Sequence, residues 1–295
     1  MKNGLAFAIV DVFADAPLQG NPLAVVANGD ALPVEVMHRI AAEFGFSETT
    51  FIVQPRDESA TWRLRSFTPT GAEVVGAGHN ALGAWWWLAD SGRLALTDGV
   101  NGFAQELGER VLPLQIRVEY SSPRRVTMEQ SAPIFGAIPE DRRPLAEGLG
   151  LDEGELQLDL PAQTVSTGVP HLLVPAASRA AVDRAVPDAS SLREILKAHG
   201  AQGCYLFSCD PHTVQHDAYA RFFNPTVGIK EDPATGSAAG PLAAYLRKYR
   251  SAGADVTIEQ GHAMGRPSTL HVRVDGDRVE ISGAAVVVAE GRLSV

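Results

Sequence analysis

The spacing of apolar residues predicts an alternation of strands and helices along the chain. The first residues, MKNGLAFAIVDVF, alternate polar and apolar positions as a half-buried β-strand does. Residues 32–45 and 190–200 instead carry apolar side chains at helical spacing, and each segment ends in a glycine that favours helix termination. An apolar strand follows each helix, at residues 47–53 and 203–208. The pattern indicates a chain of mixed α and β structure.

The same succession of segments occurs twice. GNPLAVV at residues 20–26 is echoed by GVPHLLV at 168–174, and RSFTPT at 65–70 is echoed by RFFNPT at 221–226. Acidic residues and a turn rich in small residues follow each copy of the second motif. Because these matches keep the same order, we predict two structurally duplicated halves, joined near residues 115–135.

The boundaries of the two halves follow from this repeat. We place the N-terminal half at residues 1–125 and the C-terminal half at 126–281. The end of the chain, residues 268–295, has the pattern of strands joined by a DGD hairpin turn. We expect the last strand, about 282–295, to complete the sheet of the first half.

Each half contains a glycine-rich turn directly before a predicted helix. One helix is expected to begin near Asn80 and to run through ALGAWWWLAD, and the other to begin near Thr235 and to run through GSAAGPLAAYLRKY. Glycine permits close approach of the backbone, and the unpaired N–H groups of a first helical turn attract anions. Two such turns facing a shared cleft would suit a ligand that bears a carboxylate.

Length and composition exclude several classes of protein. With 295 residues, 45% of them apolar and 20% charged, the chain is expected to form two globular domains. A formal net charge of -10 offers no basic surface for nucleic acid. No apolar run approaches the roughly 20 residues of a membrane span, and the N-terminus does not read as a secretion signal. We therefore expect a cytoplasmic protein with no membrane partner.

The two cysteines, Cys204 and Cys209, lie close together without a CxxC spacing, and no histidine cluster stands out in the sequence. We expect buried thiols and no metal site. The glycines of GAGHNALG do not have the GxGxxG spacing of a dinucleotide-binding turn, so no nucleotide cofactor is expected either.

Four polar residues near the glycine turns are candidates for chemistry. Glu48 lies between a helix stop and a strand, and partial burial there would raise its pKa into the range useful for proton exchange; it can equally be an exposed strand-end glutamate. His79 occupies the first turn, where it can exchange protons or serve structure alone. Asp232 precedes Pro233 and can contact a ligand or cap the helix. Ser237 can hold a carboxylate or be a small residue chosen for packing.

These segments resemble the phenazine biosynthesis PhzF-like family. The resemblance is carried by DVFADAPLQGNPLAVV, FSETTFIV, RSFTPTGAEVVGAGHNALGA and GIKEDPATGSAAGPL, which extend from Asp11 to Leu242. It implies an α+β fold of the diaminopimelate epimerase type, in which two pseudosymmetric domains each wrap a mixed β-sheet around a central helix and the active site lies between them. A homodimer is expected by the same analogy.

The resemblance also implies roles for residues of this chain. Glu48, His79 and Asp232 would be catalytic, with Glu48 moving a proton between carbons and no cofactor taking part. The substrate-binding residues would be Gly78, Asn80, Gly236 and Ser237. Asn80 and Gly76 depart from the family pattern, which often has a proline and a bulky apolar residue at these places, so we expect a wider pocket. At least one of the three consecutive tryptophans that follow, residues 85–87, should lie in the core.

The function predicted in this way is a cofactor-independent isomerase acting on a small carboxylated metabolite. Related epimerases use a cysteine in each of the two turns, and this chain has none there, which argues against a two-thiol racemase. A racemase or epimerase without catalytic thiols remains an alternative. A second alternative is a metabolite-binding protein that kept the fold and lost catalysis.

Overall fold

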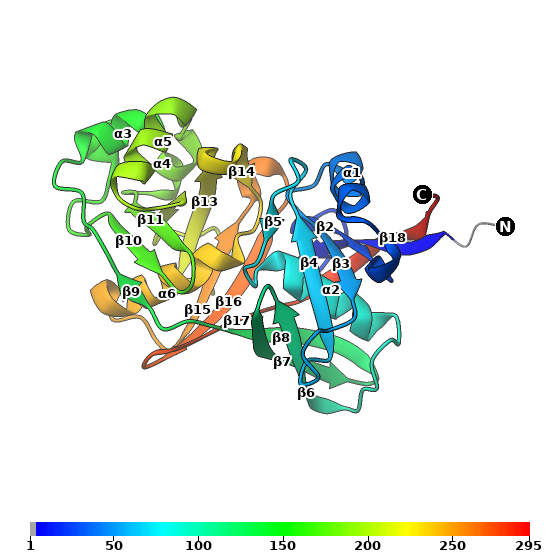
Figure 1. The fold of residues 1–295 in the computed structure, drawn as a ribbon. Helices are drawn as coiled ribbons and strands as arrows, with labels where there is room; N and C mark the ends of the chain where they lie inside the picture. Colours follow the sequence, from blue (N-terminus) through cyan, green and yellow to red (C-terminus); the bar gives the residue numbers. More distant parts are fainter. Residues whose placement is uncertain (1–3) are drawn as a thin grey trace. The chain divides into compact units, whose positions relative to one another are not determined.

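The computed structural model describes residues 4–295, so the first three residues of the predicted N-terminal strand lie outside the described residues. The chain forms two compact units. Unit 1 comprises Met1–Glu129 and Ser282–Val295, and unit 2 is Gln130–Ile281. Figure 1 shows unit 1 in blue to green with the red C-terminal strand, and unit 2 in green to orange.

Unit 1 is built from strands around one long, buried helix. Its elements in chain order are β1 (Leu5–Val12), β2 (Asn21–Val26), α1 (Val34–Phe44), β3 (Thr49–Val53), β4 (Trp62–Phe67), β5 (Glu73–Val74), α2 (His79–Asp90), β6 (Gly99–Leu107), β7 (Arg110–Glu119), β8 (Ser122–Gln130) and β18 (Ala285–Leu293). The last strand, β18, pairs antiparallel with β1, the first. Residues 115–135 were expected to join the two halves, and in the structure much of this region belongs to the antiparallel hairpin of β7 and β8.

Unit 2 contains a second set of strands and four helices. Its elements are β9 (Ile134–Phe135), α3 (Arg143–Leu149), β10 (Gln163–Ser166), β11 (Pro170–Pro175), α4 (Arg179–Arg184), α5 (Ala189–Ala198), β12 (Gly203–Ser208), β13 (Ala218–Asn224), β14 (Ile229–Asp232), α6 (Gly236–Arg250), β15 (Asp255–Gln260) and β16 (Ser268–Asp275), followed by β17 (Arg278–Gly283) at the boundary. The apolar patterns predicted α1, α5 and both helices after the glycine turns, and the structure confirms all four. The short helices α3 and α4 were not predicted.

The strand pairings of the two units follow the same order. In unit 1, β2 runs parallel to β3, β3 antiparallel to β4, β4 parallel to β6, and β6 antiparallel to β7. In unit 2, β11 runs parallel to β12, β12 antiparallel to β13, β13 parallel to β15, and β15 antiparallel to β16. Each unit thus combines parallel and antiparallel pairs with helices, which confirms the predicted α+β class.

A buried helix lies at the centre of each unit. Every residue of α2 except the last is buried, and so are most residues in the first three turns of α6. A helix that is apolar all round must be enclosed on all sides. All three tryptophans at 85–87 are therefore buried, because strands of unit 1 surround α2. The N–H of Trp85 donates to Gln105 and that of Trp87 donates to Glu290, so these two indoles are satisfied inside the unit.

One glycine lets α2 approach its sheet closely. A Cβ atom on Gly83 would lie 2.6 Å from Cγ2 of Val12 and 2.7 Å from Cδ2 of Leu23. Glycine at this position therefore sets the distance between the helix and strands β1 and β2. Gly240 occupies the corresponding place in α6, where an added Cβ would collide with the side chain of Gln130.

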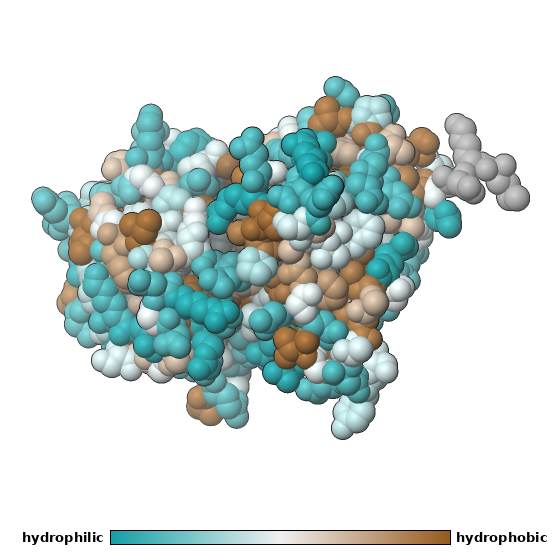
Figure 2. Space-filling model, turned by 60° about the horizontal axis from the view of Figure 1, so that its bottom comes forward, coloured by the Kyte–Doolittle hydropathy of each residue, from teal (hydrophilic) through white to brown (hydrophobic). Residues whose placement is uncertain are grey.

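The surface is largely hydrophilic on the face drawn in Figure 2, where apolar residues form small, separate groups. Among residues 4–295, no helix combines the length and the apolar character that a membrane crossing requires.

Candidate active site

The turn before α2 is held by the side chain of Asn80. Its Oδ1 accepts a hydrogen bond from the backbone N–H of Gly78 at 2.8 Å, and its Nδ2 donates to the carbonyl of Gly76 and to Oγ of Ser66, each at 3.1 Å. Asn80 is 1% exposed. Its amide thus fixes the glycine turn to strand β4. Asn80 was predicted to bind substrate, and its contacts in the structure hold the turn in place.

Glu48 and His79 lie close together in unit 1. Glu48 directly precedes β3, and His79 is the first residue of α2, which packs against that strand. Oε2 of Glu48 is 3.8 Å from Nδ1 of His79, and the two side chains are 16% and 7% exposed. Burial lowers the pKa of His79 to about 4, so the imidazole is neutral at neutral pH. A carboxylate and a neutral imidazole at a helix N-terminus form a pair suited to proton transfer.

Asp232 belongs to a buried polar network in unit 2. It ends β14, is 6% exposed, and its Oδ2 accepts a hydrogen bond from the hydroxyl of Thr235 at 2.6 Å. The amide of Gln260 donates to the carbonyl of Asp232 and accepts from the backbone N–H of Thr235. The N-cap position of α6 is Thr235, so Asp232 lies just outside the helix that it was expected either to cap or to serve.

The hydroxyl of Tyr205 completes this network by donating to Gln260 Oε1 at 2.8 Å. Burial, together with the nearby Asp232 carboxylate, raises the pKa of the Tyr205 phenol, which therefore stays protonated as a donor. Gln260 thus links Tyr205 on β12 to the turn before α6, where Asp232 lies.

Ser237 has a partner that the sequence did not reveal. Its Oγ lies 3.1 Å from Nε2 of His171 on β11, a histidine that is 2% exposed. The ring of His171 stands edge-on to Phe222, with centroids 5.1 Å apart. Burial lowers the pKa of His171 to about 3, so its imidazole is neutral. One signal was present: in the repeat, GVPHLLV has a histidine where GNPLAVV has Leu23.

Gly236, the remaining predicted residue of this turn, is the first residue of α6 and is buried. Its carbonyl accepts a hydrogen bond from Nε2 of Gln130 at 3.0 Å. The backbone of the α6 turn is therefore anchored through a side-chain amide, as Asn80 anchors the turn before α2.

Each glycine turn is preceded by a bidentate arginine–glutamate pair. Nε and Nη2 of Arg65 donate to the two carboxylate oxygens of Glu73, each at 2.8 Å. Arg221 and Glu231 repeat this arrangement at the same two distances. The acids that follow RSFTPT and RFFNPT in the sequence thus tie β5 to β4 and β14 to β13, which places the turns.

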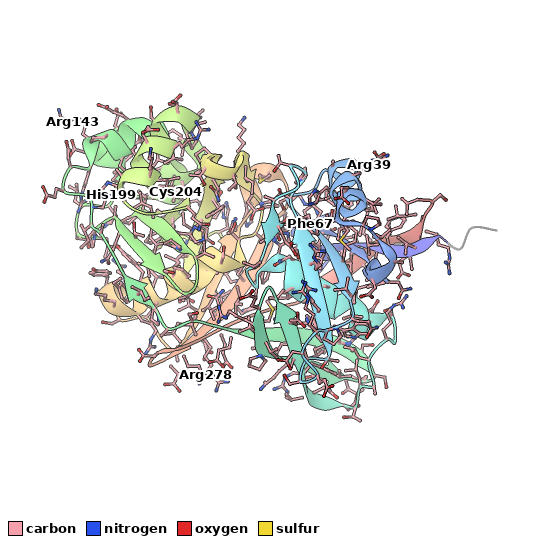
Figure 3. The ribbon with its side chains drawn as sticks, viewed as in Figure 1. Arg39, Phe67, Arg143, His199, Cys204 and Arg278 are labelled. Carbon is pink, nitrogen blue, oxygen red and sulfur yellow. The ribbon has the colours of Figure 1, made fainter. Side chains whose placement is uncertain are left out.

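Neither cysteine belongs to a glycine turn. Cys204 is buried on β12, inside unit 2 (Figure 3), and burial raises the pKa of its thiol. Cys209 is partly buried, beside a cavity of about 180 Å³ that none of the predicted site residues lines, and burial raises its thiol pKa as well. Both are protonated thiols at neutral pH, poorly suited to nucleophilic or basic roles.

Comparison with known proteins identifies the family. A family model described as "Phenazine biosynthesis-like protein" matches residues 10–291. The chain belongs to this PhzC-PhzF family. It is 34% identical to the trans-2,3-dihydro-3-hydroxyanthranilate isomerase of Pseudomonas chlororaphis over 297 residues, which cover 97% of this chain and 98% of that protein. The family resemblance expected from the motifs is confirmed, and the chain is an isomerase of the PhzF type.

Solved structures confirm the fold. The crystal structure of a PhzF-family phenazine biosynthesis protein from Bacillus anthracis aligns over the whole of both chains, with a TM-score of 0.89 and 29% identity. A hydroxyproline epimerase from Agrobacterium vitis shares the fold at a TM-score of 0.68 and 10% identity, with 99% of this chain and 91% of that chain covered. The fold is thus that of the PhzF proteins and of more distant epimerases.

Proposed function

We propose that this protein is a cofactor-independent isomerase that moves a proton between two carbons of a small carboxylated metabolite, with Glu48 as the general acid and base. The Glu48–His79 pair at the N-terminus of α2 is the observation that carries the proposal. The relative from Pseudomonas chlororaphis supports it, because the substrate named for that protein is a carboxylated ring.

The proposed reaction needs one titratable group that both accepts and returns a proton. The ionised carboxylate of Glu48 removes a proton from carbon, and the electron pair of the broken C–H bond shifts into the adjacent unsaturated system. Glu48 then gives a proton to the carbon at the far end of that system, so atoms and charge balance. The proton held by the carboxyl group exchanges with water before this second transfer, so the product carries a hydrogen from solvent. Neutral His79, whose Nδ1 lies 3.8 Å from Oε2 of Glu48, would orient the carboxylate.

The carboxylate of the substrate is proposed to bind at the N-terminus of one of the two central helices. The first-turn N–H groups of α2, beginning after Gly78, and of α6, beginning at Gly236, are suited to an anion. Ser237 would add a hydroxyl donor, and Asp232 would handle a proton or a polar group of the substrate. Asn80 is proposed to act by shaping the turn, since its amide bonds to Gly78, Gly76 and Ser66.

Exchange of hydrogen with solvent tests this proposal. The wild-type protein and a Glu48→Gln variant are incubated in D₂O with trans-2,3-dihydro-3-hydroxyanthranilate, and deuterium on carbon is followed by mass spectrometry. The wild type is expected to form an isomerised product that contains deuterium, and the variant to lose about 10²- to 10⁴-fold in rate while still binding the compound.

Glu43→Gln is the matched control, because Glu43 is an exposed glutamate on the neighbouring helix α1. It should react as the wild type does. Full turnover by the Glu48 variant would refute the role of Glu48. Binding without exchange by the wild type would favour the non-catalytic alternative, and inversion of a stereocentre would favour the epimerase alternative.

The predicted homodimer and the predicted cytoplasmic location belong to the same proposal. Light scattering of the purified full chain, expected to give twice the mass of 31.4 kDa, tests the first. Fractionation of the source cells tests the second.

A further inference from the structure

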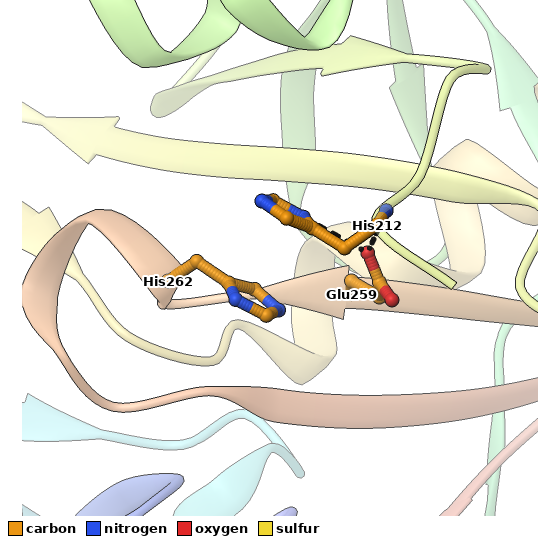
Figure 4. Close-up of side chains that lie close together, drawn as sticks. All are labelled: His212, Glu259 and His262. Atoms are coloured by element: carbon orange, nitrogen blue, oxygen red, sulfur yellow. Dashed lines mark hydrogen bonds and ion pairs between the residues drawn. The ribbon is translucent and has the colours of Figure 1, made fainter.

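A buried carboxylate in unit 2 lies close to three histidines from two separate segments of the chain. Glu259, on β15, is 2% exposed. His212 and His216 come from the loop between β12 and β13, whereas His262 comes from the short 3-10 helix His262–Met264 directly after β15. Figure 4 shows His212 and His262 on the same side of the strand as Glu259. None of these residues belongs to the candidate active site.

Both oxygens of the Glu259 carboxylate have partners in the loop between β12 and β13. Oε1 is 2.6 Å from Nδ1 of His216, and Oε2 is 3.2 Å from Nδ1 of His212 and accepts the backbone N–H of His212 at 2.7 Å. A buried anion whose ion-pair partners are histidines is a site that favours a cation.

The ring of His262 adds a donor that this hydrogen-bond network does not use. Within the part of the chain that the structure describes, its ring contacts are aromatic: it stacks on His212 at 4.1 Å with 10° between the planes, and it meets Tyr219 edge-on at 5.7 Å. The hydrogen bonds that tie the loop to Glu259 come from His212 and His216 and not from His262.

The geometry of these side chains is close to that of a metal site. One donor atom from each of His212, Glu259 and His262 lies within 4.8 Å of the other two. Ligands of a tetrahedral zinc ion, at about 2.0 to 2.2 Å from the metal, are about 3.3 to 3.6 Å apart, so rotation of the exposed His212 side chain and a small shift of His262 would close the remaining gap. The side chain of His212 is 32% exposed, which leaves a path for an ion and water.

We propose that His212, Glu259 and His262 bind a divalent transition-metal ion, with Zn²⁺ as the best match, and that water completes the coordination. Two imidazoles and one carboxylate form a donor set common in zinc sites. His216 would be a positioning residue, since its hydrogen bond to Oε1 fixes the carboxylate for the metal. The ion would clip the β12–β13 loop to the end of β15.

The position of Glu259 indicates a structural rather than a catalytic role for the ion. Successive side chains of a strand point to opposite faces, so Glu259 and its neighbour Gln260 face away from each other. Gln260 supports the turn that carries Asp232, while Glu259 faces the histidines. We therefore expect the metal to stabilise unit 2 against unfolding without being required for turnover.

Zinc titration of the untagged full-length protein, stripped with a chelator beforehand, tests the proposal. Calorimetry is expected to show one Zn²⁺ ion bound per chain and a higher melting temperature in its presence. Co²⁺ should give the visible absorption bands of a low-symmetry nitrogen and oxygen site. The variants His212→Ala and His262→Ala should each bind zinc at least about tenfold more weakly and lose these bands.

His199→Ala is the matched control, because His199 is a partly exposed histidine at the end of α5 (Figure 3). It should bind zinc as the wild type does. His262→Ala is the decisive variant, since no hydrogen bond of the loop depends on this ring. Unchanged zinc affinity in both His212→Ala and His262→Ala, or no binding by the folded wild type, would overturn the proposal. The assay does not involve the isomerase reaction, so it stands apart from the test of Glu48.

Discussion

Individual histidines in this protein have very different environments. His79 and His171 are enclosed and neutral, whereas His212 and His216 face a buried carboxylate. The enclosed rings are polar groups that the fold must keep uncharged. Their burial is a structural cost at low pH, and each imidazole can accept a proton only against that cost.

The stability of the protein should depend on pH through His171. Its pKa is about 3 in the folded state and about 6.5 when the chain unfolds, so between these values the unfolded chain binds the extra proton. The contribution is complete above pH 6.5 and is lost as pH falls. At about pH 4.5 the loss from this one group is about 2 to 3 kcal/mol.

Urea unfolding of the wild type and of His171→Gln at a series of pH values measures this effect. The variant keeps a hydrogen-bonding partner for Ser237 but cannot take up a proton, so its free energy of unfolding should fall less steeply below pH 6.5. His199→Gln should follow the wild-type curve. Parallel curves for the wild type and the His171 variant would contradict the prediction.

The elements that position the site are the two central helices and the strands that enclose them. Glycine at one position of α2 sets how near the helix lies to β1 and β2, and with it the place of His79 at the helix start. Replacing glycine by alanine normally stabilises a helix. At this position of α2 the gain in stability is opposed, because a Cβ atom would lie too close to neighbouring side chains.

Gly83→Ala is therefore expected to destabilise the protein. The new methyl group would meet Val12 and Leu23 at distances below 3 Å, and overpacking of this kind costs about 1 to 3 kcal/mol. Gly102→Ala is the control, because no heavy atom lies within 4 Å of a Cβ there, and it should change stability by less than about 0.5 kcal/mol. Chemical denaturation measures both; equal stabilities of the two variants would contradict the argument.

Periodicity and motif spacing predicted the elements better than they predicted the contacts within the site. The helices after both glycine turns and the repeat of the arginine and glutamate residues were visible in the sequence because they are local patterns. His171 was missed, because one polar residue in an apolar strand is a weak signal. The meeting of His212 with His262 was missed too, because it depends on the pairing of β13 with β15 and not on spacing along the chain. Asn80 was predicted to bind substrate from its place in a motif, and its three hydrogen bonds could be known only from the folded turn.

In the whole molecule, the duplication gives each unit one arginine–glutamate pair, and the two arginines differ in burial. The side chain of Arg65 is 21% exposed, whereas that of Arg221 is 10% exposed. Arg221 also donates through Nη1 to three backbone carbonyls near the end of α4, those of Val182, Asp183 and Ala185. The arginine of unit 2 therefore donates hydrogen bonds to more neighbouring groups than the arginine of unit 1 does.

Loss of the deeper arginine should be the more harmful change. Arg221→Met would leave Glu231 and the three carbonyls without their donor, at a cost of about 3 to 5 kcal/mol. Arg65→Met removes one carboxylate partner at a more exposed position, and we expect less than about half that loss. Urea unfolding followed by far-UV circular dichroism compares the two. A larger loss for Arg65→Met would show that the buried carbonyl contacts contribute little.

The three buried tryptophans of α2 have one more consequence, because the fourth, Trp62, begins β4 of the same unit and unit 2 contains none. Indole emission is therefore a natural optical reporter of residues 4–129 and 282–295 alone. If a denaturant unfolds unit 2 first, the far-UV ellipticity will change while the fluorescence spectrum stays the same. Circular dichroism and fluorescence together therefore distinguish the unfolding of the two units without any label.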